Sequence, residues 1–298
     1  MQKRATSSAT SRLVAMSRAL AHAGVTGMAQ FDDPVAAELL SPQYRSILRA
    51  ISLLPLPLRR VLSRATLGGL DLVPLRAAAI DAVWLRAQQQ GVRQIVILGA
   101  GLDGRAWRLP HLQDVGVWEV DHPATQASKY GRVAHRRSEA TLHFVPVDFA
   151  HDDLGVALAQ AAHDASEPTL WIWEGVAPYL PMVAVQSTLS VVQARSAPGS
   201  RIALSYIPAT GHNRLVFAAL TALVARLGEP FVGLMSTAQV AELLNHAGLL
   251  LVADTDAGDW ARQGSHRPPQ VWVRERLAEA IVSVEFLGGQ APAPNVTK

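Results

Sequence analysis

The chain has 298 residues, of which 49% are hydrophobic and 17% charged, and its formal net charge is +3. This composition is typical of a globular protein with a sizeable core and excludes a largely disordered chain. Because the chain has no cysteine, disulfides, thiolate nucleophiles and thiolate metal sites are excluded. The basic residues are scattered along the sequence, so nucleic-acid binding is not expected as the main function.

The N-terminus does not resemble a signal peptide, because Lys3 and Arg4 are not followed by an uninterrupted apolar stretch. The apolar segment 215–227 contains Arg226 and is shorter than the roughly 20 residues that a membrane-spanning helix needs. We therefore expect a cytoplasmic protein without a membrane partner. The sequence does not indicate an oligomeric state.

The first 75 residues contain five prolines, which divide them into short helical pieces that we expect to form a lid. Residues 76–90 follow as one amphipathic helix, in which Ile80 and Trp84 recur at helical spacing and Gly91 marks the end. From there, apolar runs typical of strands alternate with helical segments. This alternation predicts right-handed crossovers and a parallel sheet.

The expected strands are 95–98, 115–120, 142–147, 169–173, 201–207, 249–253 and 270–274. The expected helices between them are 123–132, 152–162, 181–195 and 236–246. Residues 208–235 form an insertion that we expect to be a second part of the lid, and the tail from Gly288 is expected to be disordered. We thus predict one catalytic domain over residues 1–298, with a lid at 1–75 and a core at 76–298.

Three of the expected strands lead into an acidic residue. The first strand breaks into Gly99 and Gly101 before Asp103, the second ends at Asp121, and the third ends at Asp148. In open α/β sheets, ligands bind beyond the carboxyl ends of the strands, and an acid at the tip of the second strand accepts hydrogen bonds from a ribose. The pattern therefore predicts a nucleotide-cofactor site.

The first loop also satisfies the dinucleotide-binding pattern G-x-G-x-x-G at Gly99, Gly101 and Gly104. A dinucleotide site needs a long helix after the third glycine to hold the pyrophosphate, whereas Pro110 leaves room for a turn or two. Asp103 would also place a negative charge beside the diphosphate. A cationic cofactor without phosphate, such as S-adenosylmethionine, fits better, and an NAD(P)-dependent oxidoreductase remains the alternative.

Four blocks of sequence, in this order, resemble the leucine carboxyl methyltransferase family, and most closely its bacterial branch of S-adenosylmethionine-dependent methyltransferases. The blocks are LGAGLDGRAWRL (98–109), WEVDHP (118–123), VDF (147–149) and WEGVAPYL (173–180), with FDDPVA (31–36) and PLR (74–76) upstream. Gly104, where the family usually has Thr, and Phe149, where it favours Leu, depart from the pattern. The resemblance implies a class I methyltransferase fold, which is a Rossmann-like α/β core whose seven-stranded sheet has an antiparallel last strand, under an N-terminal helical lid.

The resemblance implies roles for the residues that would hold the adenosine of S-adenosyl-L-methionine. Asp121 is expected to accept hydrogen bonds from both ribose hydroxyls. Asp148 is expected to accept from the adenine amino group, while Phe149 lies beside the adenine and offers its backbone N–H. Asp103, in the glycine loop, is also expected to bind the cofactor.

The resemblance also implies roles at the amino-acid end of the cofactor. Gly99 and Gly101 would let the backbone approach this group without a clash. Arg76 would pair with the carboxylate, a match that arginine makes better than lysine. Glu174 would accept from the ammonium, and Arg18 lies where the family has a second basic contact.

The expected reaction is methyl transfer to an oxygen of a small molecule, in which positioning dominates because the sulfonium is an activated donor. A phenol would need a base, whereas a carboxylic acid with a pKa of about 4 is already ionised at neutral pH. The histidines show no metal-ligand spacing, so no metal is expected. Tyr179 and Tyr206 are the predicted catalytic residues, with His122 and His212 as the other nearby candidates. We therefore expect methyl-ester formation; a phenolic or hydroxyl O-methyltransferase and a non-catalytic cofactor-binding scaffold remain open.

Overall fold

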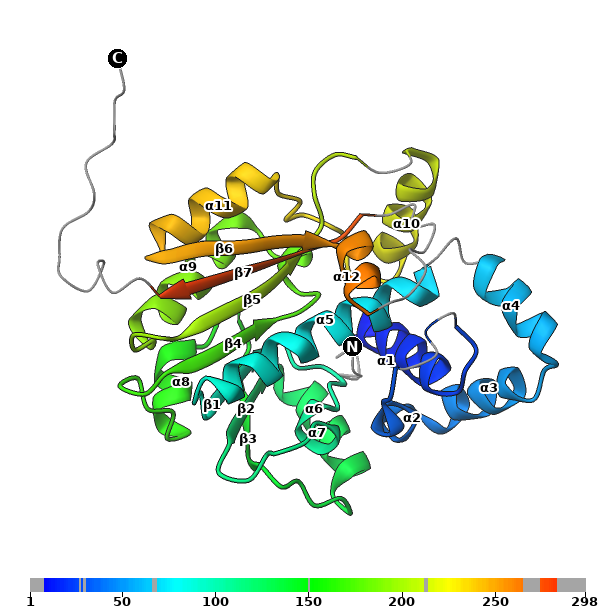
Figure 1. Ribbon diagram of the computed structural model, residues 1–298, viewed down its shortest axis with the longest axis horizontal. Coiled ribbons are helices and arrows are strands. Elements are labelled where there is room, and N and C mark those ends of the chain that lie inside the picture. Colours follow the sequence, from blue (N-terminus) through cyan, green and yellow to red (C-terminus); the bar gives the residue numbers. More distant parts are fainter. Residues whose placement is uncertain are drawn as a thin grey trace.

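The computed structural model describes residues 8–26, 28, 31–65, 69–149, 151–211, 214–264 and 274–282. These residues form a seven-stranded sheet in the order β3-β2-β1-β4-β5-β7-β6, with helices on both faces (Figure 1). The strands are β1 (Gln94–Leu98), β2 (Gly116–Asp121), β3 (Thr141–Pro146), β4 (Thr169–Trp173), β5 (Arg201–Tyr206), β6 (Leu249–Asp256) and β7 (Arg276–Val282). The first five strands are parallel and β7 is antiparallel to both neighbours, which confirms the expected class I methyltransferase sheet.

The helices fall into two groups along the chain. Before the sheet come α1 (Ala9–His22), α2 (Pro34–Leu39), α3 (Pro42–Ser52), α4 (Leu56–Ala65) and α5 (Gly69–Gln89). Between and after the strands come α6 (Arg105–Arg108), α7 (Pro123–Val133), α8 (Leu154–Gln160), α9 (Met182–Ala194), α10 (Arg214–Arg226), α11 (Thr237–His246) and α12 (Ala257–Gln263), with a 3-10 turn η1 at Ala177–Tyr179. None of the described helices is both long enough and apolar enough to span a bilayer.

The sheet is buried on both faces, as parallel sheets between helical layers are. Alternate residues of β1 enter different cores: Ile95 packs in the core with Trp84 of α5, and Val96 packs in the core with Leu189 of α9. Trp171 of β4 is fully buried in the second core. The strands are therefore held rigidly, and their carboxyl ends form a fixed platform.

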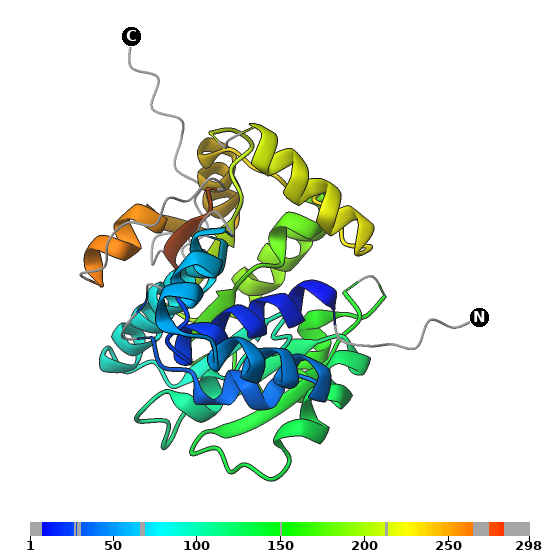
Figure 2. The same cartoon turned by 90° about the vertical axis from the view of Figure 1, so that its right-hand side faces the viewer.

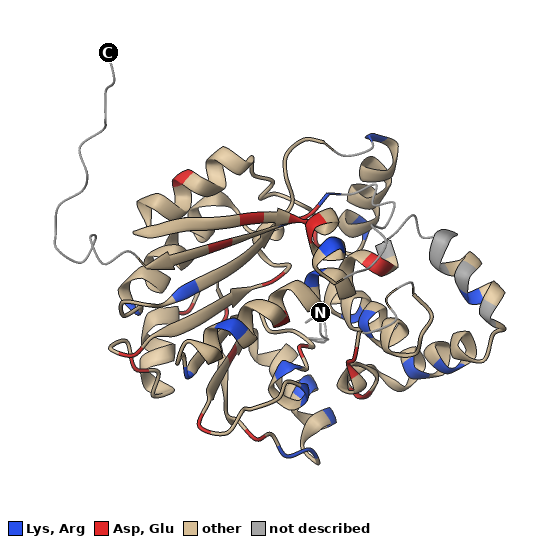
Figure 3. Cartoon of the chain, in the orientation of Figure 1, with Lys and Arg blue, Asp and Glu red and all other residues tan. Residues whose placement is uncertain are grey.

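A third core joins the first helices to that platform. Leu20 of α1 and Leu39 of α2 are buried in the same cluster as Leu102, which lies in the loop after β1. Figure 1 shows α1 beside the carboxyl ends of the parallel strands, and Figure 2 shows α1 and α10 on the same side of the molecule. Figure 3 shows basic residues on helices in several separate parts of the molecule.

Helix α5 differs from the prediction, because it begins at Gly69 and runs through Pro74 instead of beginning after it. Proline has no N–H, so the carbonyl four residues earlier loses its helical partner. That carbonyl belongs to Leu70, and the hydroxyl of Ser17 donates to it at 2.9 Å. A contact from α1 thus compensates for the proline and ties α1 to α5.

The last strand also differs from the prediction, because β7 lies at Arg276–Val282 rather than at 270–274. Leu277, Ala278 and Ala280 are buried in its pairing with β5 and β6. The tail from Gly288 and most of the predicted strand fall outside the described residues.

Candidate active site

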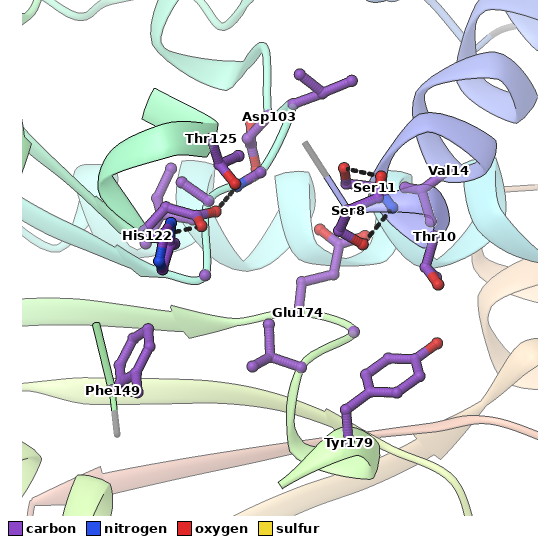
Figure 4. A pocket seen from close by; sticks show the side chains of 18 of the residues that line it. Ser8, Thr10, Ser11, Val14, Asp103, His122, Thr125, Phe149, Glu174 and Tyr179 are labelled. Carbon is purple, nitrogen blue, oxygen red and sulfur yellow. Dashed lines mark hydrogen bonds between the residues drawn. The ribbon is translucent and has the colours of Figure 1, made fainter. Parts of the chain in front are cut away.

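A cavity of about 570 Å³ opens at the carboxyl ends of the parallel strands. Figure 4 shows His122 and Phe149 at one end, Thr10, Val14 and Tyr179 at the other, and Glu174 between them. The cavity is lined by every residue predicted to bind the cofactor: Arg76, Gly99, Gly101, Asp103, Asp121, Asp148, Phe149 and Glu174.

The glycine loop after β1 forms one wall of the cavity. Gly99 and Gly101 have φ values of +67° and +51°, which favour glycine. A Cβ at Gly99 would overlap the side chain of Val176. The helix that follows, α6, has four residues, as the position of Pro110 predicted. The loop therefore offers backbone to a ligand without the long helix that a pyrophosphate requires.

Asp121 ends β2 and fixes this loop. One carboxylate oxygen accepts from the N–H of Gly101, and the other accepts from the N–H of His122 at 2.6 Å. Burial raises the pKa of Asp121, and the two backbone hydrogen bonds only partly offset that effect. The carboxylate is thus fixed beside the glycine loop, and it lines the cavity.

Asp148 and Phe149 lie where β3 ends. The carboxylate of Asp148 lies 3.0 Å from His151 Nδ1 and 3.9 Å from His122 Nε2. The backbone N–H of Asp148 donates to Asp152 at 2.8 Å, which fixes the turn. The ring of Phe149 lines the same end of the cavity (Figure 4). A carboxylate can accept a hydrogen bond from the amino group of an adenine, and an aromatic ring can pack against its base.

A buried network of ion pairs lies beside the middle of the cavity, and Arg76, Asp103 and Glu174 of this network line it. Glu174, after β4, accepts from Arg76 Nε at 2.8 Å and pairs with Arg105 Nη1 at 2.8 Å. Arg76 also pairs with Glu275 at 2.6 Å, and Arg105 with Asp103 at 2.5 Å. Arg105 and Glu275 were not among the predicted site residues. Arg105 stands two residues after Asp103 in a block that was recognised, so a sequence signal for it existed.

The network keeps its members charged. Burial alone would raise the pKa of Glu174, but Arg105 and Arg76 outweigh burial and lower it to about 2. Burial would lower the pKa of Arg76, yet Glu275 and Glu174 hold it above its ordinary value. Fixed charges of both signs therefore face one part of the cavity, which suits a zwitterionic amino-acid group.

Arg18, on α1, adds a further donor to the cavity wall. Its Nη1 pairs with the fully buried Asp33 at 2.9 Å, and its Nη2 donates to the carbonyl of Leu102. Its buried Nε has no hydrogen-bond partner in the structure. Buried donors are normally satisfied, so Arg18 Nε is an exception among the described residues.

The structure separates the two predicted catalytic tyrosines. Tyr179 lines the cavity, and its pKa is raised to about 12, chiefly by burial. Tyr206 is fully buried and is not part of the cavity wall; its hydroxyl donates to Asp254 at 2.7 Å. The structure therefore does not bring Tyr206 to the site. His122 lines the cavity, whereas His212 lies outside the described residues.

Several residues of the cavity wall were not predicted. They come from the first turns of α1 and from the segment after α10, where no recognisable motif marked them: Ser8, Thr10, Ser11, Val14 and Glu229. Among the described residues there is no group of three or more histidines and acids arranged to hold a metal ion.

Comparisons with solved structures support the fold. A DUF574 family protein from Streptomyces avermitilis superposes with a TM-score of 0.63 at 15% identity, covering 93% of this chain and 98% of that one. A methyltransferase from Thermobifida fusca superposes with a TM-score of 0.54 at 15% identity, covering 86% of this chain and 97% of that one. The architecture is that of a class I methyltransferase.

Sequence comparisons give the family. The model of the leucine carboxyl methyltransferase family matches residues 11–193. A protein of Mycolicibacterium paratuberculosis, named as an S-adenosyl-L-methionine-dependent methyltransferase, is 31% identical over 276 residues, which cover 89% of this chain and 85% of the relative. Another from the same organism is 45% identical over 139 residues, but that match spans only 46% of this chain and 43% of the relative.

The chain belongs to the leucine carboxyl methyltransferase family and is an S-adenosylmethionine-dependent methyltransferase. This confirms the family, the enzyme class and the cofactor that the sequence predicted. The glycine loop and the charged side chains of Arg76 and Glu174, which line the same cavity, are consistent with that cofactor. The individual contacts expected of Arg76, Asp121, Asp148 and the other predicted residues remain predictions.

Proposed function

We propose that this protein methylates a carboxylate oxygen of a small molecule and releases a methyl ester. When bound, the cofactor supplies an electrophilic methyl group on a sulfonium. The task left to the protein is to align the acceptor and exclude water. We call the end of the cavity that carries Thr10, Val14 and Tyr179 the acceptor side. The observation that carries the proposal is that the described residues on this side include no group poised to remove a proton.

Tyr179 is a poor base at neutral pH. Its pKa of about 12 keeps the hydroxyl protonated, so it can donate a hydrogen bond but does not offer a phenolate. In Figure 4 its hydroxyl points towards Thr10, on the acceptor side. A carboxylate acceptor arrives ionised and needs a donor to orient it, which this hydroxyl provides. A phenol with a pKa of about 10 would need a base instead.

His122 is also unsuited to the role of a base. Its Nδ1 accepts from the backbone N–H of Ala124 at 3.2 Å, so the neutral ring carries its proton on Nε2. That Nε2 faces the carboxylate of Asp148 at 3.9 Å. With the proton on Nε2 and the lone pair of Nδ1 accepting from Ala124, the neutral ring has no free lone pair for an acceptor proton. It also lies at the end of the cavity away from Tyr179 (Figure 4).

Glu229 is the remaining carboxylate on the acceptor side. Its Oε1 accepts from Ala9 N at 2.9 Å, and its Oε2 accepts from Thr10 N at 3.3 Å and from the Thr10 hydroxyl. These three contacts tie the carboxylate of Glu229 to the start of α1. The arrangement therefore favours an acceptor that needs no activation.

The proposal is tested by incubating the protein with methyl-labelled S-adenosylmethionine and matched pairs of small aromatic acids and phenols. We expect label in products that release methanol on mild alkaline hydrolysis, as esters do. We also expect a rate that is flat between about pH 6 and 9, because the acceptor is ionised throughout. An alkali-stable ether, formed at a rate that rises about tenfold per pH unit, would support the phenol alternative and contradict the ester.

A further inference from the structure

Two segments that are far apart in sequence meet over the cavity. Glu229 follows α10, and both of its carboxylate oxygens accept hydrogen bonds from the first residues of α1. The bonds to the backbone N–H groups of Ala9 and Thr10 measure 2.9 and 3.3 Å. Those N–H groups begin the helix and have no partner within it, and a negative charge at this end is stabilised by the helix dipole.

The segment that carries Glu229 is itself fixed to the core, and we call residues 229–235 the strap. The backbone N–H groups of Val232 and Gly233 both donate to the carbonyl of Pro178 at 2.9 Å. A Cβ at Gly233 would overlap the carbonyls of Ala177 and Leu180, so only glycine allows this approach. The strap therefore packs directly on η1, the turn that carries Tyr179.

The aromatic contacts of the strap reinforce this placement. The ring of Phe231 lies 5.2 Å from that of Tyr179 and 6.1 Å from that of Phe217 in α10, measured between centroids. The strap thus links α10, the turn with Tyr179 and the start of α1 in one connected unit on the acceptor side of the cavity.

The two halves of α1 are held by different partners. The second half is anchored to the platform by the hydrogen bond of Ser17 to Leu70 and by the buried pair of Arg18 with Asp33. The first turn, by contrast, meets the strap through Glu229. The first turn also carries Ser8, Thr10 and Ser11, which line the cavity. Loss of the Glu229 contact would therefore remove three hydrogen bonds from the first turn of α1 and none from its second half.

We propose that Glu229 is a latch, a positioning residue that holds the first turn of α1 over the acceptor side of the cavity, and that opening of this contact admits and releases ligands. The inference rests on the assignment of the cavity as the methyl-transfer site. It adds a moving element, the first turn of α1, and the residue that holds it closed. Glu229 acts through α1 and transfers no proton.

The first test is amide hydrogen exchange in the ligand-free protein, which needs no acceptor. In Glu229→Ala, the amides of Ala9 and Thr10 lose their acceptor, and we expect them to exchange about tenfold faster or more. The amides of the second half of α1 should keep their wild-type rates. Glu242→Ala, which removes an exposed carboxylate from α11, is the matched control and should change neither.

The second test is the kinetics of S-adenosylhomocysteine binding, followed by stopped-flow fluorescence. If the first turn is open in Glu229→Ala, the association and dissociation rate constants should both rise severalfold. The dissociation constant is their ratio, so it should change less than either rate constant. Mere destabilisation would not speed association. Thr10→Val, which removes the hydroxyl but keeps the amide, should give an intermediate effect, and its combination with Glu229→Ala should be less than additive.

The outcomes distinguish the latch from the proposed function. Unchanged exchange at Ala9 and Thr10 in Glu229→Ala, or slower association in that variant, would overturn the latch whatever the acceptor is. Faster exchange and faster association in a protein that makes an ether instead of an ester would support the latch and overturn the carboxylate assignment alone.

Discussion

Arg105 and Glu174 form an ion pair of 2.8 Å that joins the loop after β1 to the end of β4. Arg105 is 1% exposed and Glu174 12%, so water screens the pair weakly. Arg105 also pairs with Asp81 of α5 at 2.7 Å. One side chain thus connects the glycine loop, the end of β4 and the long helix α5.

Removing this cation should destabilise the whole protein. In Arg105→Met, the buried carboxylates of Asp103 and Glu174 lose a partner, which typically costs about 3–5 kcal/mol. The free energy of unfolding in urea measures the loss. Arg262→Met, which breaks an exposed pair with Asp259 on α12, should change stability little. A loss of similar size in both variants would contradict this role for Arg105.

The same network predicts how stability depends on pH. The pKa of Glu174 is about 2 in the folded protein against an ordinary value of 4.5. Because the folded value is depressed, the contribution is complete above about pH 4.5 and is lost as the pH falls towards 2. Comparing wild type with Glu174→Gln across this range isolates it, and we expect the difference in unfolding free energy to shrink by roughly 2–3 kcal/mol on acidification. A pH-independent difference would show that Glu174 is not held ionised by its arginines.

The two tyrosines should respond differently to loss of the hydroxyl. Tyr179→Phe removes the donor proposed to orient the acceptor, and we expect kcat/KM to fall about tenfold, the effect of one hydrogen bond. The pH profile should keep its shape, since a group with a pKa of about 12 does not titrate between pH 6 and 9. Tyr206→Phe should lower stability through loss of the Asp254 contact and leave kcat/KM unchanged. A fall in kcat/KM for Tyr206→Phe but not for Tyr179→Phe would indicate that Tyr206, and not Tyr179, takes part in the reaction.

Most of the sheet could be predicted because its signals are local. The apolar runs of β1 and β4 are buried on both faces, and the glycines and acids that follow the strands lie at the edge where parallel strands end. The short α6 followed from Pro110 alone. These features require no knowledge of which segments meet in space.

The features that were missed depend on contacts between distant segments. The predicted helix began only after Pro74, because the contact that compensates for this proline comes from Ser17, more than fifty residues earlier in the chain. Glu229 carries no motif, and its partners lie in the first turn of α1, 220 and 219 positions away. Tyr206 was predicted to be catalytic, but its hydroxyl donates to Asp254 on β6. Contacts of this kind depend on how distant segments pack together, and no periodic pattern of residues in the sequence indicates them.

The binding of S-adenosylhomocysteine to wild type and Asp121→Ala, measured by calorimetry, tests the assignment of this cavity as the cofactor site most directly. We expect binding to wild type and a loss of about 1.5–3 kcal/mol in the folded variant, the effect of removing a charged hydrogen-bond acceptor. Glu139→Ala, which removes an exposed carboxylate, should bind like wild type, and NADH should not bind. An unchanged dissociation constant in folded Asp121→Ala, or preferential binding of NADH, would contradict the assignment.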